Sequence, residues 1–134
     1  MAREHGYEPD WVNEDLSVFL RASRRYPFFL ESVQQDVRVF AGRNLEIYAV
    51  RLDFALEWKF RRVAQESGPR RVEADILDAL AIIDYMVEAR DGQPLSMEYC
   101  LGLDENHFGM GLEQLPVEMV ARRYLAEYGR PGIV

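Results

Sequence analysis

Apolar residues recur at helical spacing through two long segments in the middle of the chain, and this pattern restricts the fold most strongly. One side of a predicted helix over 53–66 carries Leu52, Leu56, Phe60 and Val63. One side of a second predicted helix over 72–90 carries Ile76, Leu80, Ile83 and Val87. Ser67-Gly68-Pro69 is expected to end the first helix. Glu73 and Asp75 fall in the predicted first turn of the second, where the helix dipole favours carboxylates.

Two further helices are predicted before this pair. Asp10 is placed to cap a helix whose apolar face carries Trp11, Val12, Leu16, Phe19 and Leu20. A short helix is expected over Pro27–Gln35, with Pro27 in the first turn, where its missing N–H costs nothing. The run Phe28-Phe29-Leu30 is expected in the core, with a dimer contact as the alternative.

Only one stretch of the chain predicts a sheet. Val37–Phe40 and Leu45–Val50 are typical of strands, and Ala41–Asn44 between them is typical of a turn because Gly42 and Asn44 tolerate positive φ. The sequence therefore indicates an α+β fold that is mostly helical with a small antiparallel β-hairpin. No repeat or linker interrupts it, so residues 1–134 are expected to form a single domain.

Turn and capping residues divide the last third of the chain. Ser96 is placed to cap a short helix through Leu103, and Asp104–Gly111 is expected to be a loop. A final helix has Pro116 near its start and Gly129 just beyond its end.

Composition excludes several classes of protein. With one cysteine, Cys100, and two histidines, the 134 residues cannot form an internal disulfide or the usual structural zinc site. We therefore expect no metal and no cofactor, a buried and unreactive Cys100, and a reducing, cytoplasmic setting without contact with a membrane. The net charge of −7 argues against nucleic acid as the main partner, because neutralisation of phosphates dominates that affinity.

The charges are unevenly distributed along this acidic chain. Residues 51–71 carry six cations against three acids, whereas residues 73–118 carry eleven acids against Arg90 alone. Such asymmetry is compatible with an anionic ligand on one face, or with neutralisation between the two segments inside the fold.

Four residues on the two central helices form the principal candidate site. Asp75 and Asp78 are three residues apart and share a helix face. Lys59, the only lysine, and Arg62 share a face of the preceding helix, so antiparallel pairing would bring the two pairs together. This arrangement predicts either an interhelical salt-bridge network or a ligand-binding edge. Arg61 and His107 are weaker candidates, and His107 could serve as a general base beside a carboxylate.

Several short segments resemble a bacterial and fungal family of nucleotidyltransferase-fold proteins of unknown function. The resemblance covers residues 9 to about 130 and rests on these segments: Pro9–Asn13, Val18–Leu20, the expected strand Glu46–Val50, Ala55–Lys59 with Arg61-Arg62, Asp75–Asp78, Pro94–Tyr99, Asn106 with Phe108, and Tyr128-Gly129. A Leu-x-x-Lys helix followed by an Asp-x-x-Asp helix is similar to nucleotidyltransferase-fold proteins of the abortive-infection and antitoxin type.

The chain departs from that family at the catalytic motif. Family catalysis depends on a Gly-Ser turn followed by Asp-x-Asp, which hold phosphates and magnesium, and this sequence contains neither. The resemblance therefore implies the carboxy-terminal portion of the fold. It also implies a catalytically silent module that binds an anionic ligand or an acidic protein surface through the basic edge of Lys59, Arg61 and Arg62. A homodimer is expected because loss of the front strands would leave a sheet edge and an apolar face uncovered.

Two other functions are compatible with these residues. A small isomerase, cyclase or hydrolase could use Asp75, Asp78 and His107 in a remodelled cleft. Alternatively, the chain could complete an active site together with a separately encoded catalytic half.

Overall fold

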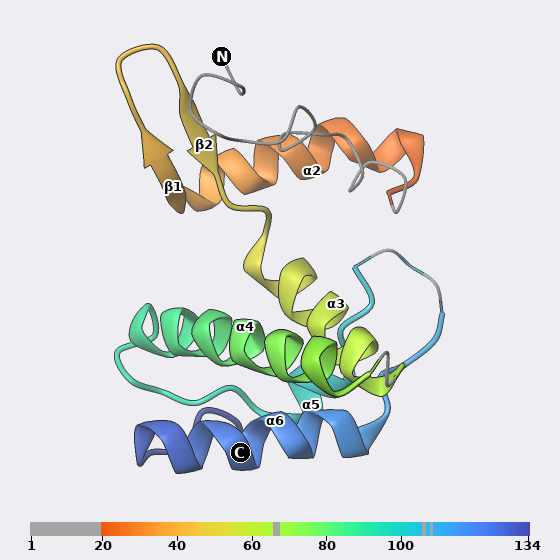
Figure 1. Ribbon diagram of the computed structural model, residues 1–134. Coiled ribbons are helices and arrows are strands. Elements are labelled where there is room, and N and C mark those ends of the chain that lie inside the picture. Colours follow the sequence, from red (N-terminus) through yellow and green to blue (C-terminus); the bar gives the residue numbers. More distant parts are fainter. Residues whose placement is uncertain (1–19, 66–67, 106, 108) are drawn as a thin grey trace.

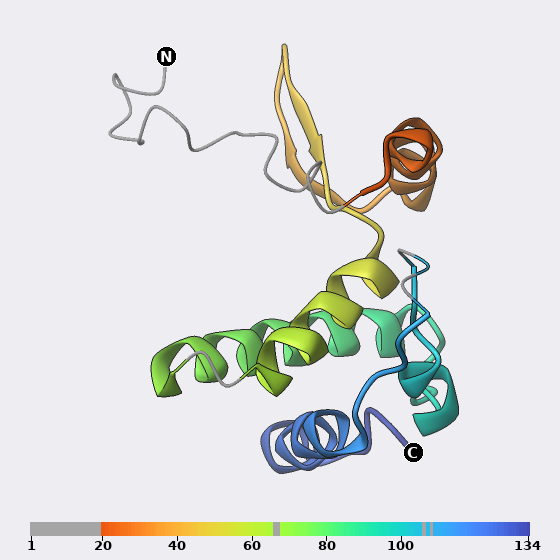
Figure 2. The ribbon, with the colours of Figure 1, turned by 90° about the vertical axis from the view of Figure 1, so that its right-hand side faces the viewer.

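The computed structural model describes residues 20–65, 68–105, 107 and 109–134, and it confirms a mostly helical α+β architecture. In chain order the elements are α2 (Ala22–Gln35), β1 (Arg38–Ala41), β2 (Glu46–Tyr48), α3 (Leu52–Ala64), α4 (Pro69–Glu88), α5 (Met97–Leu101) and α6 (Gln114–Tyr128). They form three layers: α2 with the hairpin, then α3 with α4, then α6 (Figures 1 and 2). The helix predicted after Asp10 lies outside the described residues, except for Leu20.

The main core lies where α3, α4 and α6 meet. It contains the predicted apolar positions Leu56, Phe60, Val63, Ile76, Leu80, Ile83 and Val87, together with Val117, Val120 and Tyr124 from α6. The helical spacing of the central segments therefore predicted the buried faces of α3 and α4 correctly. Leu52 is the exception, because it lies at the start of α3 and is only half-buried.

Two predicted helix starts are wrong. Helix α4 begins at Pro69, so Glu73 and Asp75 lie beyond its first turn, which carries no acidic residue. Pro69 takes the first position of α4, where proline is favoured, and does not merely end α3. Helix α2 begins at Ala22, which places Pro27 in its second turn, where proline removes one backbone hydrogen bond.

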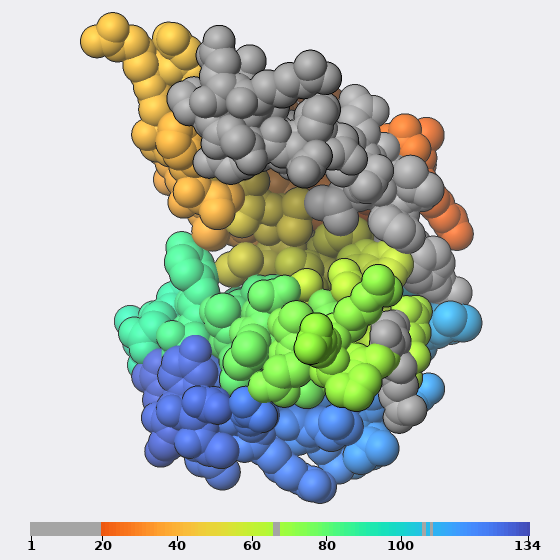
Figure 3. Space-filling model, in the orientation of Figure 1, coloured from red at the N-terminus to blue at the C-terminus, as the bar shows by residue number. Residues whose placement is uncertain are grey.

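The predicted hairpin is present, with its first strand shifted by one residue and its second strand shorter than expected. Phe40 pairs with Ile47 and Ala41 with Glu46, and Gly42 N–H donates to the Leu45 carbonyl at 2.8 Å to close the turn. All four β1 residues are exposed, and the space-filling view shows the hairpin projecting from the body at upper left (Figure 3). A two-stranded sheet alone is marginally stable in water, so this hairpin needs support from α2, whose Phe29 and Val33 line a cleft together with Ile47 and Tyr48 of β2.

Side chains of α2 cap the start of α3 and so join the two parts of the molecule. Ser32 Oγ accepts from Arg51 N–H at 3.2 Å, and Gln35 Oε1 accepts from Leu52 N–H at 2.8 Å. The first amides of a helix have no partner within the helix, and here α2 provides one. Beside these bonds the rings of Phe28 and Phe54 meet edge to face, with centroids 4.7 Å apart, in a second small core.

The carboxy-terminal end of the chain closes the helical part. Gly129 lies just beyond the end of α6, as predicted, and it adopts the left-handed conformation with φ of 67°. The chain then returns so that Leu95 N–H donates to the Gly132 carbonyl and Val134 N–H to the Leu95 carbonyl, both at 2.8 Å. Ser96 caps α5 as expected, since its hydroxyl accepts from Tyr99 N–H at 3.1 Å.

None of the helices in the described part of the chain combines the length and apolar character needed to cross a membrane.

Candidate functional site

The four principal candidate residues lie together between α3 and α4. Lys59 Nζ is 3.1 Å from Asp75 Oδ1 and 2.7 Å from Asp78 Oδ2. Arg62 Nε is 3.0 Å from Asp75 Oδ2. Antiparallel packing of the two helices brings Lys59 onto both acids and Arg62 onto Asp75, so the two pairs meet as the sequence predicts.

The four residues differ in how deeply their side chains are buried. The Asp75 side chain is 4% exposed and receives both cations, whereas the Asp78 side chain is 58% exposed. Burial opposes the charge of Lys59, but hydrogen bonds to Asp78 and Asp75 outweigh it and raise the pKa of the ammonium group. Two cations and two carboxylates make the cluster neutral as a whole.

In this geometry the ion cluster links α3 to α4. Leaving Asp75 without its cations would strand a charge in the interior, so the pairing is required for packing. The three clefts considered below are lined by other residues. No group of three or more His, Cys, Asp or Glu side chains within the described ranges is arranged to hold a metal ion. A ligand-binding role for Lys59, Arg62, Asp75 and Asp78 stays a prediction.

A second ionic network surrounds Glu57, which the sequence analysis did not single out. Glu57 is 1% exposed, although it is an acid on a helix. Its carboxylate accepts from Arg61 Nε and from Glu105 N–H, both at 2.8 Å. Arg61 also donates to the Met110 carbonyl at 2.8 Å. Arg61, a weaker candidate for ligand binding, therefore fastens the loop after α5 onto α3.

Arg51 extends this ionic contact to α2. Its guanidinium is 2.7 Å from Glu31 Oε2 and 2.9 Å from Glu105 Oε2, and it also pairs with Asp53. Burial opposes the charge of Arg51, but the bonds to Asp53, Glu105 and Glu31 outweigh it and raise the pKa of the guanidinium. Residues from three segments thus meet at one cation.

The two remaining chemical candidates are placed differently. His107 is exposed in the loop after α5, with φ of 55°, and its N–H donates to the Asp104 carbonyl at 3.0 Å. Cys100 is buried, as predicted, and burial raises the pKa of its thiol to about 12. A thiol that stays protonated is a poor nucleophile and a poor metal ligand.

Helix α2 carries an apolar face that the described residues leave largely uncovered. Tyr26, Phe29 and Leu30 are 69%, 59% and 39% exposed, and Val33 follows at the same helical spacing. We call Tyr26, Phe29, Leu30 and Val33 the α2 stripe. The expectation that Phe28-Phe29-Leu30 lies in the core is correct only for Phe28, which points about 200° away from Tyr26 and packs on Phe54.

A cleft of about 360 Å³ runs beside the α2 stripe. Phe29 and Val33 form one wall, and Ile47, Tyr48 and Val50 from the hairpin and the segment after it form another. The cleft is mainly apolar, and Arg25 and Glu46 are the charged residues among its described lining. A surface of this kind suits contact with apolar side chains of another protein segment.

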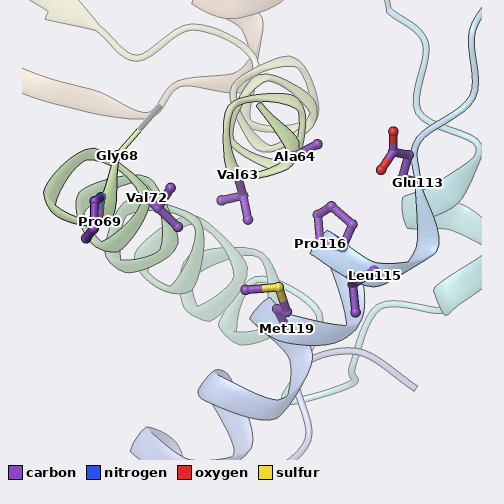
Figure 4. Close-up of a pocket in the computed structure, with 9 residues that line it drawn as sticks. All are labelled: Val63, Ala64, Gly68, Pro69, Val72, Glu113, Leu115, Pro116 and Met119. Atoms are coloured by element: carbon purple, nitrogen blue, oxygen red, sulfur yellow. The ribbon is translucent and has the colours of Figure 1, made fainter. Parts of the chain in front are cut away.

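Two other clefts lie in the helical part. One of about 360 Å³ opens where α3 ends and α4 and α6 begin (Figure 4), and its lining residues are Val63, Ala64, Gly68, Pro69, Val72, Glu113, Leu115, Pro116 and Met119. Among the described residues of that lining, Glu113 is the one that carries a charge. The other, of about 340 Å³, lies between the start of α3 and the end of α4, beside Tyr85 and Tyr99. Burial, followed by the charge of Asp53, raises the pKa of Tyr99 to about 12, so its hydroxyl stays protonated.

Comparison of this chain with models of protein families, with curated proteins and with solved structures gives no significant match.

The sequence analysis predicted neither the burial of Glu57 nor the exposure of the α2 stripe, and the sequence contains a specific signal only for the first. Glu57 and Arg61 are four residues apart on a helix, the spacing of an intrahelical ion pair, but that pattern is typical of exposed residues. Burial of Glu57 follows from a loop almost fifty residues away, as the bond from Glu105 shows. The α2 stripe has helical spacing, yet spacing alone does not tell a covered face from an uncovered one.

Proposed function

We propose that this protein is a protein-interaction module, and that its contact surface is the α2 stripe with the adjoining cleft. The main observation in support is that α2 has two apolar faces. On one face Phe28 packs on Phe54, whereas Tyr26 and Phe29 on the other face are more than half exposed. An i, i+3, i+4, i+7 set of apolar anchors is the pattern with which helices pack against partner proteins. Leaving two aromatic side chains in water is costly unless a partner covers them.

The basic edge of α3 is a weaker contact surface. Lys59, Arg61 and Arg62 each have a carboxylate partner, so an anionic ligand would have to compete with Asp75, Asp78 or Glu57. The proposed module therefore differs from the one that the resemblance implies in where it makes contact. The absence of Gly-Ser and Asp-x-Asp from the sequence supports a module that does not transfer nucleotides.

A cytoplasmic location and descent from a nucleotidyltransferase-like fold remain parts of this proposal. The first is supported by a single, buried cysteine, which suits a reducing compartment. The second is supported by the sequence segments alone. A shift in melting temperature with nucleotide and magnesium would favour a surviving nucleotide site, because a ligand bound only to the native state stabilises it.

Photo-crosslinking tests the proposed surface. A benzoylphenylalanine at position 29 should give adducts of discrete mass in cells of the source organism, because the aromatic side chain lies at the proposed contact. The same group in place of Leu77, which is 47% exposed on α4, is the matched control. Absence of an adduct at position 29, or the same adducts at position 77, would overturn the proposal.

A further inference from the structure

The α2 stripe has a symmetry that narrows the choice of partner. Tyr26, Phe29, Leu30 and Val33 have the same spacing in both directions about the midpoint between Phe29 and Leu30. A two-fold axis through that midpoint places the stripe on a copy of itself, with Tyr26 against Val33 of the partner subunit. Self-complementary patches of this kind define two-fold dimers, the commonest form of oligomer.

The charges of α2 fix the direction of such a pairing. Beside the stripe, Arg25 lies near the amino end of α2 and Asp36, which also pairs with Arg38, lies at its carboxyl end. Arg24 and Glu31 lie on the opposite side of the helix, about 150° or more from the stripe, where Glu31 pairs with Arg51. Antiparallel helices bring the basic end of one beside the acidic end of the other, and their dipoles also oppose each other favourably. Parallel helices would instead place Arg25 beside Arg25 of the partner subunit.

The cleft beside the stripe provides the pocket that a stable contact needs. Phe29 and Val33 form its wall, so side chains of a second stripe would enter it when the two helices pair. Apolar side chains that fill a pocket near the centre of an interface contribute most of the binding free energy. Arg25 and Glu46, which also line this cleft, supply the polar groups that such an interface carries beside its apolar centre.

We infer that the partner of the α2 stripe is a second copy of this chain, bound through antiparallel α2–α2 packing about a two-fold axis. This inference rests on the proposed function and names its partner. The dimer covers Tyr26 and Phe29 of both subunits and leaves the α3–α4 ion cluster outside the interface.

Measurement of mass in solution tests the inference on the full chain. Sedimentation of the wild type across a concentration series should show a species of twice the 15.6 kDa monomer. Phe29→Glu should raise the dissociation constant at least about tenfold, which corresponds to about 1.4 kcal/mol. Leu77→Glu, at an exposed apolar position of α4, should leave it unchanged. Circular dichroism and the melting temperature establish that both variants are folded.

Disulfide trapping tests the direction of packing. Tyr26→Cys mixed with Val33→Cys should form a crosslinked dimer on mild oxidation, whereas either variant alone should not. Parallel packing would give the reverse result and would overturn the inference. The native Cys100 does not compete, because it is buried and its raised pKa keeps the thiol protonated.

The outcomes separate this inference from the proposed function. A monomeric wild type whose residue 29 crosslinks to a different protein overturns the self-pairing and leaves the interaction module. A monomeric wild type whose residue 29 crosslinks within its own chain, to the segment before residue 20, overturns both. A monomeric wild type that gives no adduct at residue 29 also overturns both the self-pairing and the interaction module.

Discussion

The buried carboxylate of Glu57 accepts a hydrogen bond from the backbone N–H of Glu105, 2.8 Å away. Its second oxygen receives Arg61, so both oxygens have partners within a site that is 1% exposed. A carboxylate held in this way fixes the loop after α5 at a defined position on α3.

Replacement of Glu57 by Gln should loosen that loop. The amide nitrogen of glutamine cannot accept from Arg61, and an unsatisfied buried group costs about 1–3 kcal/mol. We expect a loss of that size in the free energy of unfolding by urea. Hydrogen exchange should also become faster at Glu105 and Gly109. Glu113→Gln, at an exposed position before α6, is the control. An unchanged exchange rate at Glu105 would contradict this role.

Asp75 and Asp78 should differ in their contributions to stability although both bind Lys59. Asp75→Asn leaves Lys59 and Arg62 without a buried partner, which costs about 1.5–3 kcal/mol because hydrogen bonds to charged groups are stronger than neutral ones. Asp78→Asn removes an ion pair whose acid is 58% exposed, so a loss of about 1 kcal/mol or less is expected. Equal losses in thermal unfolding would show that burial does not set the difference.

The Asp84 carboxylate should make stability depend on pH in the acid range. Hydrogen bonds from Tyr124 and then Arg130 outweigh partial desolvation and lower the pKa of Asp84 below its usual 3.8. A lowered folded-state pKa gives stability that is present above the unfolded pKa and is lost as pH falls through the folded one. The difference in melting temperature between wild type and Asp84→Asn should therefore be constant above pH 5 and shrink below about pH 3.8. Tyr124→Phe removes the main donor, so it should reduce this acid dependence.

Gly132 should tolerate no side chain. A Cβ at this position would lie 2.6 Å from the Tyr124 ring and 2.8 Å from Ile83 Cγ2, far inside contact distance. Overpacking of a core costs about 1–3 kcal/mol, so Gly132→Ala should lower the melting temperature by several degrees. Pro131→Ala, at the exposed neighbouring residue, is the comparison. Wild-type stability for Gly132→Ala would mean that the carboxyl-terminal segment moves freely away from α6.

Local patterns were sufficient to predict most of the helices and one of the ionic contacts. The apolar positions of α3 and α4 identified their buried faces, and the same two faces then placed Lys59 opposite Asp75 and Asp78. This success has a simple cause. Two adjacent helices joined by a short connection pack antiparallel, and their relative position follows from which sides are apolar.

The features that were missed depend on contacts between distant segments. Pro27 was expected to start a helix because proline favours the first turn, but α2 begins earlier and accommodates the lost hydrogen bond. Phe29 was expected in the core because it is large and apolar, and its exposure follows from the absence of any described element over that side of α2. Burial of Glu57 required knowledge of the loop that covers it.

The capping of α3 by α2 has a mechanical consequence. If α2 moved away from α3, the backbone N–H groups of Arg51 and Leu52 would lose the oxygen atoms of Ser32 and Gln35 that accept their hydrogen bonds. They would then be exposed to solvent or left without an acceptor. The two layers therefore cannot hinge independently without fraying a helix. A protein that binds the outer side of α2 is therefore coupled, through α3, to the whole molecule.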